Sequence, residues 1–182
     1  GLINTLGPIG GAIFGFFYAP IVITGMHHSF TAVETQLLAD IATTGGSFIF
    51  PVAAMSNVAQ GAAALSVLLI LRKDNKMKGI ASASGISALL GITEPAIFGV
   101  NLKLRYPFYG AMIGSGVSSA YIMLTKVLAL APGAAGLPGI ISIRPDSMIN
   151  YSIGMAISMV VAVVSTIILA KTTAKKENLE VA

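Results

Sequence analysis

One acidic side chain lies within a stretch of the chain that is otherwise suited to lipid. Glu94 falls in the segment 91–108, which reads GITEPAIFGVNLKLRYPF. A carboxylate at the centre of a membrane segment costs roughly 2.5–3.5 kcal/mol on insertion scales, so its presence points to a function. It could accept hydrogen bonds from two substrate hydroxyls, carry a proton, or take the proton of an attacking hydroxyl. We predict that Glu94 is catalytic and binds substrate; the alternative is a kinked structural helix in which it pairs with a buried cation.

A histidine pair, His27-His28, follows a glycine break after another apolar segment. Adjacent residues on a helix point about 100° apart, so at most one of them faces a given site. We predict that one histidine contacts a substrate hydroxyl; the alternative is one interfacial and one buried structural histidine. No metal site is predicted, because the chain has no HExxH pattern and no cysteine, and the carboxylates nearby in sequence are Glu34 and Asp40.

Amide side chains and a threonine complete the polar candidates. Thr93 and Asn101 lie in the same segment as Glu94, and we predict both as substrate contacts. The alternative for Asn101 is an anchoring role at the end of the segment. Asn57 and Gln60 lie three residues apart, hence on one face of a helix. For these two, hydrogen bonding across helices is the favoured role, and lining the site is the alternative.

The backbone around Glu94 is predicted to break a helix. The residue before a proline is disfavoured in the α region, and Pro95 suits the first turn of a new helix, where its missing N–H costs nothing. Unpaired backbone groups are tolerated at membrane depth only beside protein or a water-filled cavity. Since transporters form midplane substrate sites from broken helices, we expect Glu94 at the junction of two short helical pieces.

The composition indicates an all-α polytopic membrane protein. The 182 residues have a mean hydropathy of +0.86, and only 10% of them are charged, against about 25% in soluble domains. The net charge is +4, but the basic residues cluster in short loops and at the C-terminus, which indicates topology rather than nucleic-acid binding. The chain contains no cysteine, Walker loop, nucleophile elbow or GxGxxG fingerprint, so we predict no cofactor.

The membrane elements are expected in the apolar segments 1–24, 48–71, 79–100, 108–130 and 147–170. The first is rich in glycines spaced for close helix contact, and prolines at both ends make it shorter than a full span. The segments 48–71, 108–130 and 147–170 are predicted to cross the membrane. Between them, 29–46 resembles an amphipathic or loop-embedded helix, and 131–145 is a proline- and glycine-rich loop.

The path of the 79–100 segment follows from the positive-inside bias. The basic loop 72–78 is predicted to be cytoplasmic. If 79–100 crossed the membrane, Lys103, Arg105 and the C-terminal lysines would all lie outside. If it enters and returns on one side, all of these residues are cytoplasmic, and the C-terminus with them. We therefore predict a re-entrant helical hairpin with Glu94 near its turn.

Three strings in these segments resemble the membrane (IIC) component of bacterial phosphotransferase-system sugar permeases. They are GMHHSFTAVETQLLAD (25–40), GGSFIFPVAAMSNVAQGAA (45–63) and GITEPAIFGVNLKLRYPF (91–108). Residues 91–95 match the [GH][IV]TEP motif of the glucose–glucoside superfamily, and FTAVETQ after the histidines is most similar to sucrose permeases. The resemblance implies that 1–182 is the C-terminal part of a IIC domain, without the N-terminal IIC helices and without IIB. The start at Gly1 with no basic n-region of a signal peptide agrees with this expectation.

The resemblance implies group translocation of a sugar across the bacterial inner membrane. Sucrose, or a related disaccharide or glucoside, would bind in the membrane domain, be phosphorylated on a primary hydroxyl by a phosphocysteine of IIB, and be released as sugar phosphate. The chain would be the membrane subunit of this phosphotransferase, with the phosphoryl-carrying residue outside it. Its partners would be phosphorylated IIB, with IIA and the general phosphocarrier proteins upstream, the lipid bilayer, and a second copy in a homodimer. By motif matching, Glu94 and one of His27 and His28 would contact the sugar.

The alternative function is ion-coupled secondary sugar transport with Glu94 as the proton carrier. The two functions differ in what drives uptake, a phosphorylated IIB donor or a proton gradient. An intramembrane hydrolase would need a nucleophile or metal that the sequence does not show. The sequence leaves open the choice among sucrose, trehalose and β-glucosides, the histidine that faces the site, and whether IIB is fused or separate.

Overall fold

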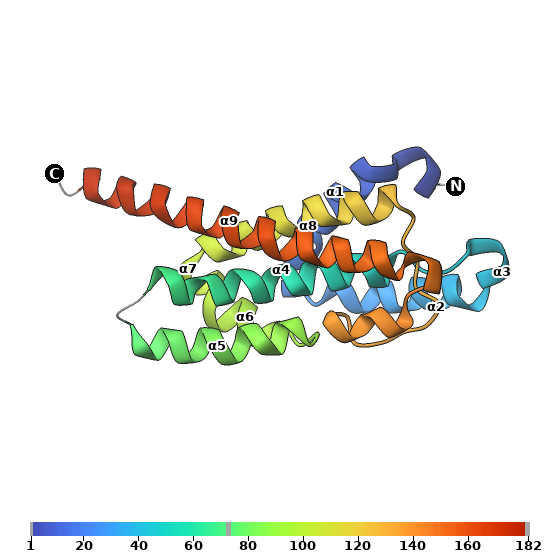
Figure 1. Cartoon of the computed structure of the whole chain (residues 1–182), viewed down its shortest axis with the longest axis horizontal. Coiled ribbons are helices and arrows are strands. Elements are labelled where there is room, and N and C mark those ends of the chain that lie inside the picture. Colours follow the sequence, from blue (N-terminus) through green and yellow to red (C-terminus); the bar gives the residue numbers. More distant parts are fainter. Residues whose placement is uncertain (1, 72–73, 181–182) are drawn as a thin grey trace.

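The computed structural model describes residues 2–71 and 74–180, with the side chains of 7–71 and 74–173. These residues fold almost entirely into helices, and β-structure among them is limited to the isolated bridges Ser47–Ala129 and Ala129–Ile143. Figure 1 shows long helices lying roughly along one axis, with shorter helical pieces beside them. The predicted all-α architecture is therefore confirmed.

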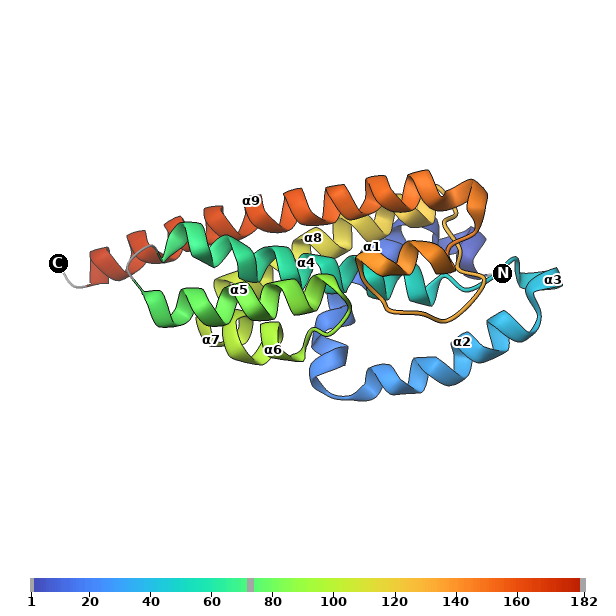
Figure 2. The same cartoon turned by 60° about the horizontal axis from the view of Figure 1, so that its bottom comes forward.

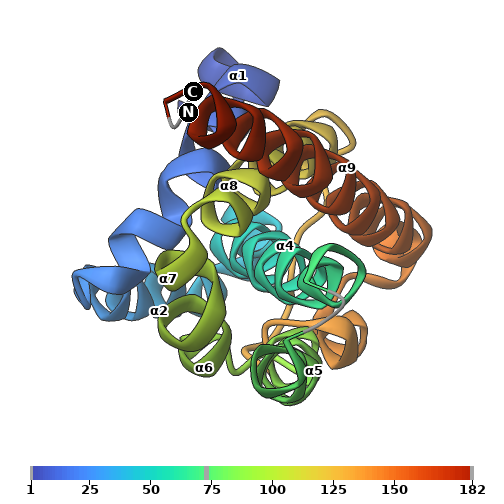
Figure 3. The same ribbon diagram turned by 90° about the vertical axis from the view of Figure 1, so that its left-hand side faces the viewer.

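Helix α4 (Ile49–Ile70) is the centre of the bundle. Viewed end-on in Figure 3, it lies among α5 (Asn75–Leu89), α8 (Tyr106–Leu124) and α9 (Met148–Glu180). Most of its side chains are buried, and 72% of its most apolar 18-residue stretch is buried inside the molecule. A helix that is apolar on all sides is suited to such a position. The span predicted over 48–71 corresponds to α4.

Small residues allow α8 to approach its two long neighbours closely. On one side it packs on α1 (Leu2–Ile23), where the Ser115 hydroxyl donates a 2.7 Å hydrogen bond to the carbonyl oxygen of Gly15. On the other side it meets α9 at Gly114, where an added Cβ would lie 2.8 Å from the Cβ of Ala162. The glycine-mediated helix contact predicted for 1–24 is thus confirmed at Gly15.

The first apolar segment ends in a sharp bend. Gly7 interrupts the helical dihedrals of α1, and the helix axes over Gly7–Ile23 and Met26–Ala39 differ in direction by 118°. After the bend come η1 (Met26–His28), α2 (Ser29–Ala39) and α3 (Ile41–Thr44). None of the side chains of α2 is fully buried, which agrees with the amphipathic or loop-embedded helix predicted within 29–46.

The segment 79–100 forms a helical hairpin, as predicted. After Leu89 the chain turns and returns as the short elements α6 (Glu94–Ala96), the π-helix η2 (Ile97–Asn101) and α7 (Leu102–Leu104). Figure 2 shows these elements lying along α5, with the turn at the C-terminal end of α5. Buried alanines and valines from both arms and from α4 hold the hairpin together: Ala64, Val67, Ala81, Ala88, Ala96 and Val100.

Two described helices are long and apolar enough to cross a membrane, over Ile49–Ile70 and Pro145–Thr173. The bent helices Gly7–Ile23 and Met26–Ala39 would count as a third if they form one span. α8, which corresponds to the span predicted over 108–130, is not among them and ends earlier than predicted, at Leu124. The chain leaves the helix there because Lys126 takes a positive φ of 54° and Ala129 pairs with Ser47.

Helix α9 is longer than the predicted 147–170 segment. It continues to Glu180, because residues 171–180 contain no glycine or proline and are mostly good helix formers. The loop predicted over 131–145 contains the short 3₁₀ helix η3 (Leu137–Ser142), and a second one, η4 (Pro145–Ser147), begins at its last residue. Both begin with a proline in the first turn, where the fixed φ of proline suits a helical start.

The basic residues of the returning arm lie at the end of the molecule where α4 and the apolar part of α9 end. Lys103 and Arg105 line a common cavity with Ile70 at the end of α4 and with Leu169, Ala170 and Thr173 of α9. Arg144 lies at the opposite end, where its backbone N–H donates to Leu128 and its side chain pairs with Asp146 at 2.7 Å. This arrangement is the one expected for a returning hairpin. Of the predicted basic loop 72–78, Arg72 and Lys73 lie outside the described residues.

Candidate functional site

Glu94 lies at the tip of the hairpin with its side chain exposed. It begins the returning arm, and Pro95 occupies the first turn, so the predicted break between two helical pieces is confirmed. Thr93, immediately before it, is buried, and its carbonyl oxygen accepts a 2.9 Å hydrogen bond from the backbone N–H of Ile97. A carboxylate in the first turn of a helical segment is favoured by the unpaired N–H groups there.

The tip of the hairpin rests on the loop that precedes α9. Gly91 has φ +106°, a conformation that glycine adopts without strain, and a Cβ there would lie 3.2 Å from the backbone nitrogen of Ala135. The loop is held in turn by two side chains. The Asn57 amide donates to the Ala135 carbonyl at 2.7 Å, and the Tyr151 hydroxyl donates to the Gly136 carbonyl at 3.0 Å. The position of Glu94 thus depends on α4 and α9 as well as on its own hairpin.

The bend after α1 brings the histidines to this tip. Figure 2 shows the bend beside α6, and the end-on view of Figure 3 also places α2 next to α6 and α7. The packing that causes this is apolar: Val22 and Ile23, just before the bend, contact a buried cluster that includes Ile97, just after the tip. The carboxylate of Glu94 lies within electrostatic range of the His27 imidazole.

The two histidines differ in their surroundings. Their ring centroids are 4.0 Å apart with an interplanar angle of 37°, so the rings touch. His28 is exposed, whereas His27 is half-buried, and the backbone of Val22 lies within hydrogen-bonding reach of its imidazole. An imidazole has two ring nitrogens, so His27 keeps a hydrogen-bonding group that a bound hydroxyl could use.

Asn101 lies elsewhere, buried between the hairpin and α4. Its amide nitrogen donates to the side-chain oxygen of Gln60 at 2.6 Å and to the Gln60 backbone carbonyl at 3.0 Å. The structure therefore does not bring Asn101 together with Glu94 and His27, and its contacts are those of a residue that joins helices. The same role, predicted for Gln60, is confirmed by its hydrogen bond to Asn101, whereas Asn57 bonds the carbonyl of Ala135 in a loop rather than a second helix.

Some residues that shape the tip carry no signal in the sequence. The Ser87 hydroxyl donates to the carbonyl of Ile92 at 3.1 Å, and the Ile92 N–H donates to the carbonyl of Ser87 at 3.0 Å, which closes the turn. The loop around Ala135 was predicted only as a connection. Its proline and glycine content signalled a turn, but no local pattern indicated that it meets the hairpin, because that contact joins segments more than forty residues apart.

The chemistry available at this site is hydrogen bonding to a polar, hydroxyl-bearing molecule. Glu94 can accept hydrogen bonds or a proton, and His27 can donate or accept one. Among the residues that the structure describes, no group of three or more His, Asp or Glu side chains is placed to hold a metal ion. The site therefore has groups suited to orienting a hydroxyl and handling its proton.

Comparison with known proteins gives a consistent relationship. Residues 1–116 match the family model described as "Phosphotransferase system, EIIC". The chain is 66% identical over 170 residues, 93% of its length, to a protein of Pasteurella multocida named "PTS system sucrose-specific EIIBC component". It is also 66% identical to a protein of that name in Vibrio alginolyticus, over 92% of this chain, and 50% identical to the "PTS system trehalose-specific EIIBC component" of Bacillus subtilis, over 91%.

The chain spans 36% of the Pasteurella protein and 35% of each of the other two. No solved structure matches it significantly. The match to the family model covers well over half of the chain and includes the hairpin, the histidine pair and Glu94. The chain belongs to the phosphotransferase system EIIC family.

Proposed function

We propose that this chain is the sugar-binding part of the membrane component of a phosphoenolpyruvate-dependent phosphotransferase system. The observation that carries the proposal is the exposed Glu94 carboxylate, at the tip of a hairpin with the TEP motif, within electrostatic range of His27 at the bend after α1. Hydrogen bonds to ionised groups are about twice as strong as neutral ones, so an exposed carboxylate in range of an imidazole suits a ligand rich in hydroxyls. Membership of the EIIC family supports a sugar as that ligand.

Sucrose is the proposed substrate. Two of the most similar relatives carry sucrose in their names and are 66% identical to the chain, whereas the trehalose-specific relative is 50% identical. Both disaccharides are large, uncharged and rich in hydroxyl groups, so we expect the choice between them to depend on a few contacts. A panel of sucrose, trehalose and β-glucosides, assayed for phosphorylation by the protein as the cell makes it, tests this assignment.

The proposed reaction transfers a phosphoryl group to a sugar hydroxyl. The sulfur–phosphorus bond of phosphocysteine on IIB breaks, a bond forms between phosphorus and a primary sugar oxygen, and the hydroxyl proton leaves. Glu94 would orient this hydroxyl and accept its proton, since phosphoryl transfer depends mainly on positioning and charge. The relatives are named EIIBC components, which supports IIB as the partner of this IIC chain. IIA and the phosphocarrier proteins would act upstream of IIB.

The proposal includes an orientation and an assembly. The end that carries Lys103 and Arg105 would face the cytoplasm, by the positive-inside bias, together with the C-terminus. The chain would form part of the IIC domain of a larger inner-membrane protein, which would work as a homodimer.

The deciding experiment separates phosphoryl-driven uptake from ion-coupled transport. Membrane vesicles with a collapsed proton gradient, supplied internally with phosphorylated IIB, should still accumulate sucrose as sucrose phosphate. If Glu94 serves instead as a proton carrier, uptake will stop when the gradient collapses and free sucrose, not its phosphate, will accumulate when the gradient is present. That second result would overturn the proposal.

A further inference from the structure

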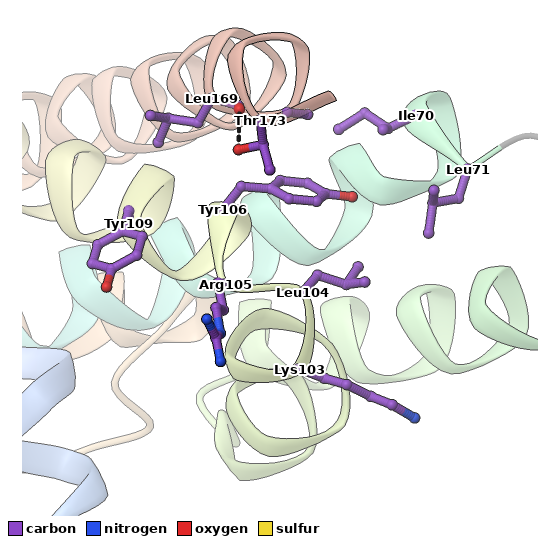
Figure 4. Close-up of a pocket in the computed structure, with 10 residues that line it drawn as sticks. Ile70, Leu71, Lys103, Leu104, Arg105, Tyr106, Tyr109, Leu169 and Thr173 are labelled. Atoms are coloured by element: carbon purple, nitrogen blue, oxygen red, sulfur yellow. Dashed lines mark hydrogen bonds between the residues drawn. The ribbon is translucent and has the colours of Figure 1, made fainter. Parts of the chain in front are cut away.

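A large cavity lies away from Glu94, at the end of the bundle where α4, α7, α8 and α9 meet. Its volume is about 810 Å³, and none of the candidate sugar-site residues lines it. Figure 4 shows the Tyr106 ring between the ends of α4 and α9, with the side chains of Lys103 and Arg105 on the α7 side of the ring. We propose that this cavity binds the headgroup of an acidic phospholipid.

The cavity lies at the depth where lipid headgroups are found. Its walls include Ile70 and Leu71, at the end of α4, and Leu169, Ala170 and Thr173, at the end of the apolar length of α9. These two helices are the described ones that are long and apolar enough to cross a membrane, over Ile49–Ile70 and Pro145–Thr173. Since both apolar lengths end at the cavity, it lies at the boundary between hydrocarbon and water.

The polar part of the lining suits a phosphate ester. Lys103 and Arg105 are exposed, and neither forms an ion pair with any described residue. The hydroxyl of the half-buried Tyr106 is itself buried and has no hydrogen-bond partner among the described residues. Two unpaired cations beside an unpaired hydroxyl donor can bind phosphate oxygens with charge-assisted hydrogen bonds, and an arginine can do so with two parallel bonds.

The backbone at Arg105 holds these groups in place. Arg105 has φ 64° and ψ −55°, an unfavourable conformation for a residue with a side chain. This single residue turns the chain from α7 into α8 and thereby places Lys103 and Tyr106 on the same cavity. Strained backbone of this kind persists where surrounding structure enforces it, and it is concentrated at ligand sites.

The apolar walls distinguish a lipid from a soluble phosphate. Ile70, Leu71 and Leu169 provide hydrocarbon surface beside the cations, which would be suited to the upper part of acyl chains. A soluble anion gains nothing from this surface, whereas a phospholipid uses both parts of the lining. Basic pockets between membrane helices bind acidic headgroups in this manner.

The test measures lipid binding without sugar or phosphoryl donor, so it is independent of the proposed transport function. The protein as the cell makes it is placed in nanodiscs of phosphatidylcholine with or without phosphatidylglycerol, and bound lipid is measured by native mass spectrometry after release. We expect preferential retention of phosphatidylglycerol and a thermal stabilisation of several degrees. Lys103→Gln with Arg105→Gln should lower retention at least tenfold, and Tyr106→Phe should lower it severalfold.

The matched control is Lys126→Gln, which removes an exposed lysine at the opposite end of α8 and should leave retention unchanged. If the double variant does not fold, Tyr106→Phe and Lys103→Gln alone decide the question, since both retain the turn at Arg105. Equal retention of phosphatidylcholine, or equal loss in the Lys126 variant, would overturn the proposal. Two further results would overturn it. One is that inorganic phosphate stabilises the detergent-solubilised protein against heat as strongly as phosphatidylglycerol does. The other is that the double variant keeps its lipid and loses only the binding of phosphorylated IIB.

Discussion

Glu94 is exposed at the tip of its hairpin, within electrostatic range of the His27 imidazole and in the first turn of a helical segment. This position resolves the difficulty of an acidic residue in an apolar segment, because the backbone break places the carboxylate where a polar ligand can reach it. The structure shows no ion pair between Glu94 and a described cation, which was the alternative considered from the sequence. The carboxylate is therefore free to bind a ligand.

Replacing Glu94 by glutamine should weaken sucrose binding while preserving the shape of the tip. Loss of a charge-assisted hydrogen bond costs about 1.5–3 kcal/mol, which corresponds to a roughly 10- to 140-fold higher Kd. Isothermal titration of the purified protein with sucrose measures the change. Asp40→Asn is the matched control, since Asp40 is also an exposed carboxylate but its side chain caps no helix. An unchanged Kd for Glu94→Gln would assign Glu94 a structural role.

The two histidines should differ in their contribution to binding. His27 is half-buried and lies within electrostatic range of Glu94, whereas His28 is exposed. We expect His27→Gln to weaken sucrose binding by about 0.5–1.5 kcal/mol, the value of a neutral hydrogen bond, and His28→Gln to have a smaller effect. The same titration compares them, and a larger loss for His28→Gln would show that the bend turns the other ring toward the sugar.

At the scale of elements, the hairpin depends on contacts with segments far away in the chain. Its arms pack on α4 through small apolar side chains, and its tip rests on the loop that Asn57 and Tyr151 hold in place. The π-helix η2, between Glu94 and the strained Arg105, adds a further irregular element, and such elements are frequent at functional sites.

Gly91→Ala should disturb the tip, because alanine at φ +106° is strained and its Cβ would lie 3.2 Å from the nitrogen of Ala135. We expect a loss of stability of about 1–3 kcal/mol together with weaker sucrose binding, since Glu94 lies three residues away. Gly79→Ala is the control: Gly79 lies within α5, where an added Cβ would meet nothing within 4 Å. It should be neutral or stabilise by up to about 1 kcal/mol. Thermal unfolding in detergent distinguishes the two variants.

The hydrogen bond between Asn101 and Gln60 should couple the hairpin to α4. Asn101→Ala leaves the buried side-chain oxygen of Gln60 without its donor, at a cost of about 1–3 kcal/mol. After Gln60→Ala the Asn101 amide nitrogen keeps only its bond to the backbone carbonyl of residue 60. In a double-mutant cycle, Asn101→Ala and Gln60→Ala should therefore be non-additive by about 0.5–3 kcal/mol in the free energy of unfolding. Additive effects would mean that the 2.6 Å contact contributes no coupling to stability.

At the scale of the whole molecule, the returning hairpin determines which charged groups lie at each end of the helix bundle. Lys103 and Arg105 lie with the ends of α4 and of the apolar part of α9, and Arg144 lies at the far end. A hairpin that returns preserves this arrangement, whereas a full crossing at 79–100 would have placed Lys103 with Arg144.

Cysteine labelling should detect this sidedness in intact cells. This chain has no cysteine, so Lys103→Cys and Arg144→Cys introduce single reporters, in a background where any other cysteine is blocked. An impermeant maleimide added outside should label the Arg144 variant and leave the Lys103 variant unlabelled until the membrane is opened. Labelling of both variants from outside would contradict the proposed orientation, and the reverse pattern would invert it.

Much of this fold could be predicted from the sequence because the information is local. The apolar length of 48–71 indicated a membrane helix, Pro95 after Glu94 indicated a break, and the position of basic residues indicated a returning hairpin. The ends of helices were less well predicted. α8 ends at Leu124, and α9 continues to Glu180, because apolar composition alone does not mark where a helix stops.

The tertiary structure alone decided which polar residues meet. Asn101 and Thr93 lie in the same motif as Glu94, yet Asn101 is bonded to Gln60 in α4, and Thr93 is buried. His27, by contrast, is more than sixty residues from Glu94 in the sequence. It lies toward the tip because the chain bends after α1 and an apolar cluster packs the end of α1 against Ile97. Residue type and local spacing determined the available chemistry, whereas the long-range burial of small apolar side chains determined which groups share a site, since such contacts leave no local pattern in the chain.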